Sequence, residues 1–227
     1  METVIYACDV GSTRTDGKRR AGSGFGWACV SSGPETVDAD RRSVEAMADA
    51  IGHDLRQGRS VALGFECPLF IPLPRAAAHL CTGRTGEGNR SFAAPAGLAV
   101  TTLGLQQATW LLKQLAGYRG SVHFTLDPRD WPPGERQVLF CWEAFVSGKA
   151  HSDTHTGDAL TAVRAFSQIA DLAAVQDVEV HPKNVDPANV ELLSLIGMAA
   201  VWSGWSTDMA DLRRPCVVIK PEARLDQ

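Results

Sequence analysis

The chain has no apolar run long enough to cross a bilayer, no paired cysteines and little net charge. A membrane-spanning helix needs ~20 largely apolar residues. The first ten residues, METVIYACDV, also lack the basic start and apolar stretch of a secretion signal. The six cysteines form no C-x-x-C pair, which argues against a structural zinc site and a disulfide framework. We therefore expect a cytoplasmic protein with reduced thiols and no membrane partner.

The balance of charged and apolar residues allows a globular protein but does not identify its partner. The formal net charge of −4 gives no overall attraction to nucleic acid, although local charge can still steer one. A hydrophobic fraction of 44% is sufficient for a core. Because the chain shows no repeat, low-complexity segment or linker, we predict one α/β domain over residues 1–227.

Hydrophobic periodicity predicts strands that alternate with helices, which is typical of an α/β fold. The expected strands cover 3–10, 24–30, 60–66, 121–126, 137–142 and 215–221, and the first two are expected to form a hairpin. Helices are expected over 43–57, 99–116, 156–174 and 187–204, with Ser43 as the N-cap of the first and Thr154 or Thr156 as that of the third. Residues 67–98, rich in proline and glycine, are predicted to be a loop insertion, and residues 175–227 a C-terminal extension.

Four acidic residues follow strand-like runs or begin a helix-like one. Asp9, Glu66 and Glu143 end apolar runs, and Asp158 enters the helix-like HTGDALTAVRAF. Right-handed crossovers make the strands parallel, so their carboxyl ends meet at one edge of the sheet. Carboxylates gathered inside a fold repel each other unless a cation neutralises them. The spacing therefore predicts a site for Mg²⁺ or Mn²⁺.

Such a cluster suits two-metal hydrolysis of a phosphodiester bond. Asp9 would bridge two ions, while Glu66 and Asp158 would each complete one ion's coordination. Glu143 would be an outer ligand or a hydrogen-bond acceptor. His155 lies three residues before Asp158 on the same helix face and would orient the water, relay a proton or bind metal.

Basic residues near these segments are candidates for phosphate contacts, although exposed basic residues are often merely solvated. Those on the predicted hairpin tip and on the 67–98 loop are Arg14, Lys18, Arg19, Arg84 and Arg90.

Two motifs and the order of elements resemble the ribonuclease-H-like superfamily, in particular RuvC-type resolvases and a set of predicted RNase-H-like nucleases. H-T-G-D-A-L (155–160) is similar to the start of the last helix of RuvC-type enzymes, and F-E-C-P-L-F-I-P-L-P (65–74) to the acid-x-Pro-Leu turn of the predicted nucleases. The resemblance covers a core of residues 3–172. It implies a mixed sheet flanked by helices, a magnesium-dependent nuclease acting on DNA or RNA, and Asp9, Glu66 and Asp158 as ligands. A homodimer, as in resolvases, is one option. A third strand over 35–40 would complete the family's usual hairpin extension.

Other interpretations stay open. Asp9 could cap the turn at Gly11 and Ser12, and Asp158 could be a first-turn acid favoured by the helix dipole. The chain would then be an inactive interaction domain with this fold. The segment D-V-G-S-T also resembles the first phosphate loop of the actin and sugar-kinase superfamily. That class needs a second D-x-G loop, which this sequence lacks, so a nucleotide-binding protein is the weaker alternative.

Overall fold

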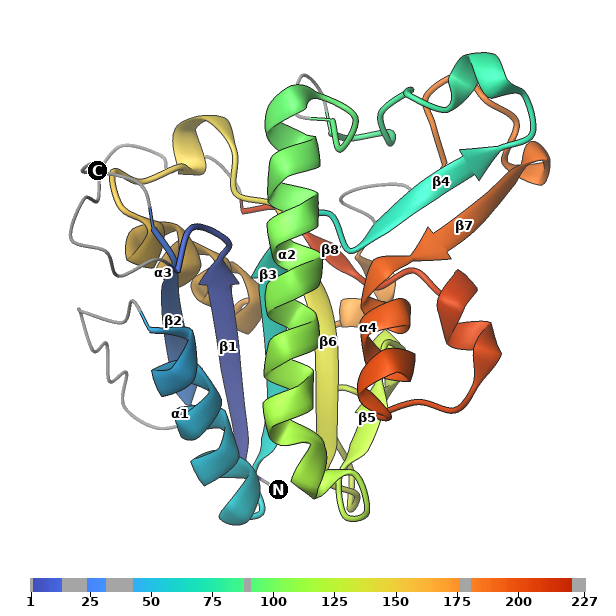
Figure 1. Ribbon diagram of the computed structural model, residues 1–227. Helices are drawn as coiled ribbons and strands as arrows, with labels where there is room; N and C mark the ends of the chain where they lie inside the picture. The colour runs from blue at the N-terminus through green and yellow to red at the C-terminus, as the bar shows by residue number, and fades with distance from the viewer. Residues whose placement is uncertain (1, 14–23, 32–42, 88–90, 176–180, 222–227) are drawn as a thin grey trace.

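The computed structural model describes residues 2–13, 24–31, 43–87, 91–175 and 181–221, in which a six-stranded mixed sheet forms the centre (Figure 1). The strand order is β2-β1-β3-β6-β5, and β8 also pairs with β6. Only β2 runs antiparallel to its neighbour. The strands are β1 (Thr3–Asp9), β2 (Gly26–Ser31), β3 (Ser60–Glu66), β5 (His123–Thr125), β6 (Val138–Ala144) and β8 (Val218–Ile219). This confirms the predicted α/β class, and the arrangement is consistent with a ribonuclease-H-like sheet.

Helices cover both faces of this sheet, as side-chain alternation along the strands requires. One core joins α1 (Val44–Arg56), α2 (Pro95–Gln114) and α4 (Leu195–Ser203) to one face. A second core joins α3 (His155–Ser167) to the other face, where Trp142 packs 4.8 Å from Phe166 between ring centroids. Each strand residue therefore belongs to a defined face, which decides which of the acidic side chains can meet.

Local signals place the starts of α1 and α3 where the sequence predicts them. The hydroxyl of Ser43 accepts a hydrogen bond from the Ala46 amide at 3.1 Å and begins α1. Thr154, the first of the two candidates, does the same for α3 by accepting from the Gly157 amide at 3.0 Å. The helix predicted over 156–174 ends earlier, at Ser167. The N-cap at Thr154 matters because it positions Asp158 in the first turn.

The prediction of a loop over 67–98 is wrong in part, because this segment contains β4 (Phe70–Pro74), a strand of a second, two-stranded sheet. Its antiparallel partner is β7 (Val190–Ser194), so the helix predicted over 187–204 begins only at Leu195. Prolines are tolerated in β4 because each of its residues pairs on one side only. Strand β4 of the insertion and β7 of the C-terminal extension thus form one arm, which Figure 1 shows beside the main sheet.

Two further expectations concern a third strand near the hairpin and the absence of a membrane-spanning helix. The strand expected over 35–40 lies outside the described residues. Among the helices of the described ranges, none is both long and apolar enough to cross a membrane.

Candidate metal centre

Asp9 and Glu66 meet at the carboxyl ends of two neighbouring parallel strands. They are register partners, since Asp9 of β1 pairs with Glu66 of β3. Partners in register place their side chains on the same face of a sheet, and here that face is the one covered by α3. The crossover through α1 therefore brings these two predicted residues together as expected.

Asp158 reaches the same edge from the first turn of α3. Its side chain is buried, with a relative exposure of 1%. One carboxylate oxygen accepts a hydrogen bond from the Ser152 amide at 2.5 Å. The other lies 2.6 Å from Nδ1 of His151. The Ser152 amide and the first turn of α3 thus hold this carboxylate in a fixed orientation.

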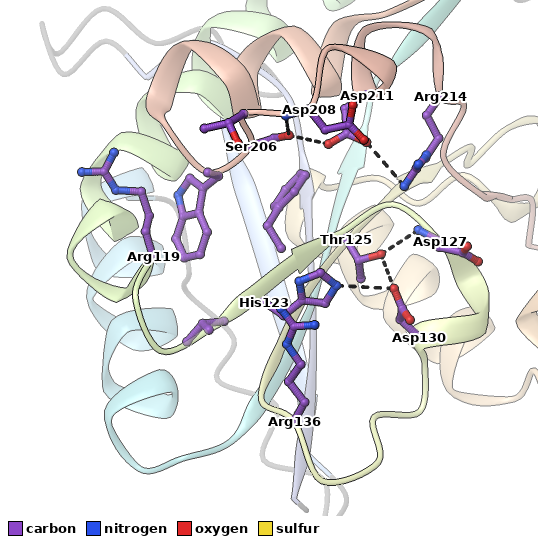
Figure 2. A pocket seen from close by; sticks show the side chains of 14 residues that line it. Arg119, His123, Thr125, Asp127, Asp130, Arg136, Ser206, Asp208, Asp211 and Arg214 are labelled. Carbon is purple, nitrogen blue, oxygen red and sulfur yellow. Dashed lines mark hydrogen bonds and ion pairs between the residues drawn. The ribbon is translucent and has the colours of Figure 1, made fainter.

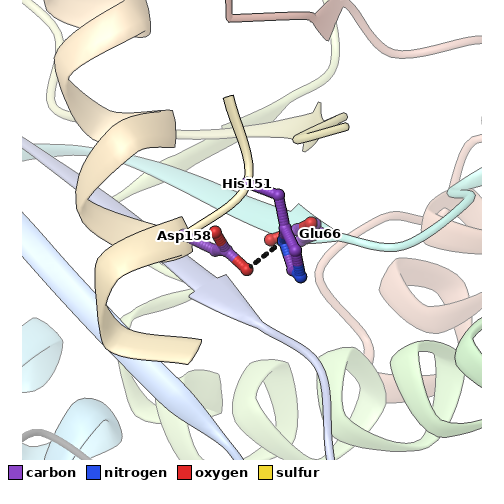
Figure 3. A group of neighbouring side chains, drawn as sticks. All are labelled: Glu66, His151 and Asp158. Carbon is purple, nitrogen blue, oxygen red and sulfur yellow. Dashed lines mark ion pairs between the residues drawn. The ribbon is translucent and has the colours of Figure 1, made fainter. Parts of the chain in front are cut away.

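Glu66, His151 and Asp158 form a compact group of ligand atoms (Figure 3). One ligand atom from each lies within 4.8 Å of the other two. Ligands bound about 2.2 Å from one ion are roughly 3–4.5 Å apart, so small side-chain adjustments would suffice to bind a cation. Two carboxylates suit Mg²⁺ and Mn²⁺, and the imidazole makes the donor set fit Mn²⁺ and other first-row divalent ions better than Mg²⁺.

Asp9 lies beside this group rather than within it. Burial raises the pKa of the Asp9 carboxyl, the hydrogen bond and charge of His155 oppose that rise, and Asp158 adds to it. His151 also lowers this pKa through its charge. Asp9 is the register partner of Glu66, and its hydrogen bond to His155 connects it to the first turn of α3. Together the four side chains line one end of the sheet.

His155 contacts Asp9 and is not a member of the three-residue group. Its Nδ1 is hydrogen-bonded to Oδ2 of Asp9. Its Nε2 accepts a hydrogen bond from the Gly24 amide at 3.2 Å. Both ring nitrogens are therefore engaged by the chain itself, which differs from the predicted role as a metal ligand or proton relay.

The structure contradicts the prediction that Glu143 joins the cluster. Glu143 pairs in register with Phe65, one residue short of Glu66, so its side chain lies on the opposite face of the sheet. There it is fully buried and receives hydrogen bonds from the Leu69 amide at 2.8 Å and from Arg84. A shift of one residue along a strand reverses the face, and this places Glu143 on the face opposite Asp9 and Glu66.

Arg84 is the partner of Glu143, which contradicts its predicted role as a surface contact for phosphate. The guanidinium is buried between Glu143, at 2.5 Å, and Glu87, at 2.9 Å. Burial raises the pKa of Glu143, and Arg84 opposes that rise. This group holds the insertion against β6. The other predicted phosphate contacts, Arg14, Lys18, Arg19 and Arg90, lie outside the described residues.

His151 is the site residue that the sequence analysis missed. It lies in HSDTHTGD, a polar loop that is easily interpreted as solvated. It lies seven positions before Asp158 but ahead of α3, which begins at His155, so helical spacing does not place it beside Asp158. The hydrogen bond from the Ser152 amide to Asp158 and the contact of His151 with the same carboxylate fold the loop back over the helix. The available sequence signal for His151 was its position shortly before the predicted ligand Asp158.

A hollow of about 370 Å³ lies at the β5 edge (Figure 2). Several of its polar groups bind each other. Asp130 accepts from Thr125 at 2.5 Å, and Asp211 accepts from Ser206 at 2.6 Å. Burial and the nearby Arg136 lower the pKa of His123 on its wall. Because these acids are engaged within the wall, the hollow defines a ligand less well than the group of Glu66, His151 and Asp158 does.

Comparisons with protein-family models, with curated proteins and with solved structures found no significant match. The chemistry of the site therefore has to be argued from its own residues.

Proposed function

We propose that this chain is a metal-dependent nuclease that hydrolyses phosphodiester bonds in DNA or RNA by a two-metal mechanism. The observation that supports this most strongly is the convergence of Glu66, His151 and Asp158 within 4.8 Å at the carboxyl edge of a mixed sheet. Sites in open α/β sheets are commonly built at this edge.

The four side chains have complementary parts in this proposal. Glu66, His151 and Asp158 would hold one ion, and Asp9 would extend the site toward a second. Divalent cations bound there would supply an activated water and a positive charge for the scissile phosphate. Buried Asp158 is already held by the Ser152 amide, so its orientation is set before any ion binds.

Exposure at the site is compatible with a large substrate. The side chain of His151 is 47% exposed, whereas that of Asp158 is 1% exposed. Asp158 is thus held inside the protein, whereas His151 faces solvent. An open edge of this kind would admit a polymer backbone, and not only a small molecule.

The test is cleavage of labelled single-stranded, double-stranded and branched DNA and of RNA, with Mg²⁺, Mn²⁺ or EDTA. Asp158→Asn and Glu66→Gln remove a ligand charge while keeping shape. We expect each to lower metal-dependent cleavage by more than about 100-fold, since even residues that support metal ligands are worth 10–100-fold. Asp153→Asn is the matched control, because Asp153 is exposed in the same loop.

Three outcomes separate the proposals. Metal-dependent cleavage that the two variants lose, and the control keeps, supports the nuclease. Binding of Mn²⁺ without cleavage of any substrate would favour a non-catalytic domain with the same fold. A rise in melting temperature with ATP, and none with nucleic acid, would favour the nucleotide-binding alternative.

A further inference from the structure

His155, the first residue of α3, makes hydrogen bonds at both ring nitrogens. The Gly24 amide can only donate, so Nε2 must present its lone pair. A neutral imidazole carries its single proton on the other nitrogen. The proton is therefore on Nδ1, which faces Oδ2 of Asp9. A doubly protonated ring would set two N–H groups against each other at Gly24.

Glycines make this arrangement possible by letting β2 approach α3. A Cβ atom on Gly26 would lie 2.5 Å from the carbonyl carbon of His155. A Cβ atom on Gly11 would lie 1.9 Å from the carbonyl oxygen of Gly24. Both distances are far below a normal contact, so larger residues would separate these segments. The close approach keeps the Gly24 amide against Nε2 of His155.

We propose that His155 is a positioning residue, which donates from Nδ1 to Asp9 and thereby orients Asp9 toward the metal ions of the proposed nuclease. The inference rests on the proposed function for the identity of what Asp9 binds. His155 itself neither ligates a metal nor transfers a proton, because Nε2 is occupied by Gly24 and Nδ1 by Asp9. Supporting hydrogen bonds of this kind fix a ligand's orientation and raise metal affinity.

The tautomer gives a test that needs no metal. In metal-free wild-type protein with ¹⁵N-labelled histidine, we expect the His155 signals of a protonated Nδ1 and an unprotonated Nε2. The His155→Asn spectrum assigns those signals by their loss. Protonation at Nε2, alone or at both nitrogens, would overturn the inference whether or not the protein binds metal.

Replacing the ring by two amides tests the positioning role itself. In His155→Asn the side-chain amide nitrogen takes the approximate place of Nδ1, whereas in His155→Gln it takes that of Nε2. We expect Mn²⁺ affinity, measured by electron paramagnetic resonance, to stay within about threefold in His155→Asn. In His155→Gln and His155→Ala it should fall 10–100-fold. Thermal unfolding of each variant provides the folding control.

The outcomes distinguish this inference from the proposed function. Equal loss of affinity in His155→Asn and His155→Ala would identify the ring as a ligand or a packing element and overturn the inference. Unchanged affinity in all three variants would overturn it as well. Absence of Mn²⁺ binding by wild-type protein with protonated Nδ1 would instead refute the metal site, and leave the hydrogen-bond assignment standing.

Discussion

Replacing Arg84 by methionine should destabilise the protein strongly, because it would leave two buried carboxylates without a cation. Arg84 is 2% exposed, Glu87 3% and Glu143 0%. The guanidinium lies 2.9 Å from Glu87 and 2.5 Å from Glu143, and it stacks 4.3 Å from the ring centre of Phe70. Breaking a buried ion pair from one side typically costs about 3–5 kcal/mol. That is a large part of the roughly 5–15 kcal/mol by which a domain is stable.

The pH dependence of this loss has a definite sign. Burial already raises the pKa of Glu143, and Arg84 opposes the rise. Without Arg84 the folded-state pKa of Glu143 rises further above its unfolded value. Stability is then greatest when the carboxyl is protonated and is lost as pH increases through the folded pKa. The deficit of Arg84→Met should therefore be smaller at pH 5 than at pH 8, as measured by urea unfolding.

A double-mutant cycle with Glu143→Gln tests the same reasoning. In the single variant Glu143→Gln, the side-chain NH₂ group faces a donor of Arg84 or Leu69. The free energy of unfolding should therefore fall by about 1–3 kcal/mol. In the Arg84→Met background it removes an unpaired charge and should restore stability. A loss below about 1 kcal/mol in Arg84→Met, or no rescue in the double variant, would refute the argument.

Other predictions address the core and the metal edge. Gly64→Ala would set a Cβ atom 2.4 Å from Trp142 and should lower the free energy of unfolding by about 1–3 kcal/mol. The control is Gly117→Ala, where a Cβ meets nothing within 4 Å, and an unchanged urea midpoint in Gly64→Ala would contradict the packing. The raised pKa of Asp9 means that its ionised form costs stability, increasingly so as pH rises through that pKa. In EDTA at pH 7 we expect Asp9→Asn to be more stable than the wild type by roughly 0.5–2 kcal/mol, whereas Mn²⁺ should stabilise the wild type more than the variant, which keeps Glu66, His151 and Asp158. Equal stabilisation of both proteins by Mn²⁺ would be the contrary result.

Much of the candidate site could be predicted from local sequence. Asp9 and Glu66 each end an apolar run, and a helix lies between the two runs, so crossover handedness alone places them side by side. Asp158 follows a threonine N-cap, which sets its place in the first helical turn. These features depend on residues that are close together in the chain, so local sequence patterns predict them.

The parts that could not be predicted depend on long-range contacts. Glu143 differs from the expectation by a single residue of register, which no local pattern encodes. The pairing of β4 with β7 joins segments more than a hundred residues apart. The prolines in β4 argued against a strand, because the central strands of a sheet exclude proline. The sequence does not show that β4 pairs only with β7, where prolines are tolerated. His151 joins the site through loop packing rather than spacing.

Crystals grown with Mn²⁺ and measured for anomalous scattering would test the metal centre most directly. We predict a peak about 2.0–2.4 Å from a carboxylate oxygen of Glu66 and of Asp158 and from a ring nitrogen of His151. His155 should remain bonded to Asp9. No peak at this edge with saturating Mn²⁺, or a peak bound by Glu143 instead, would contradict the account.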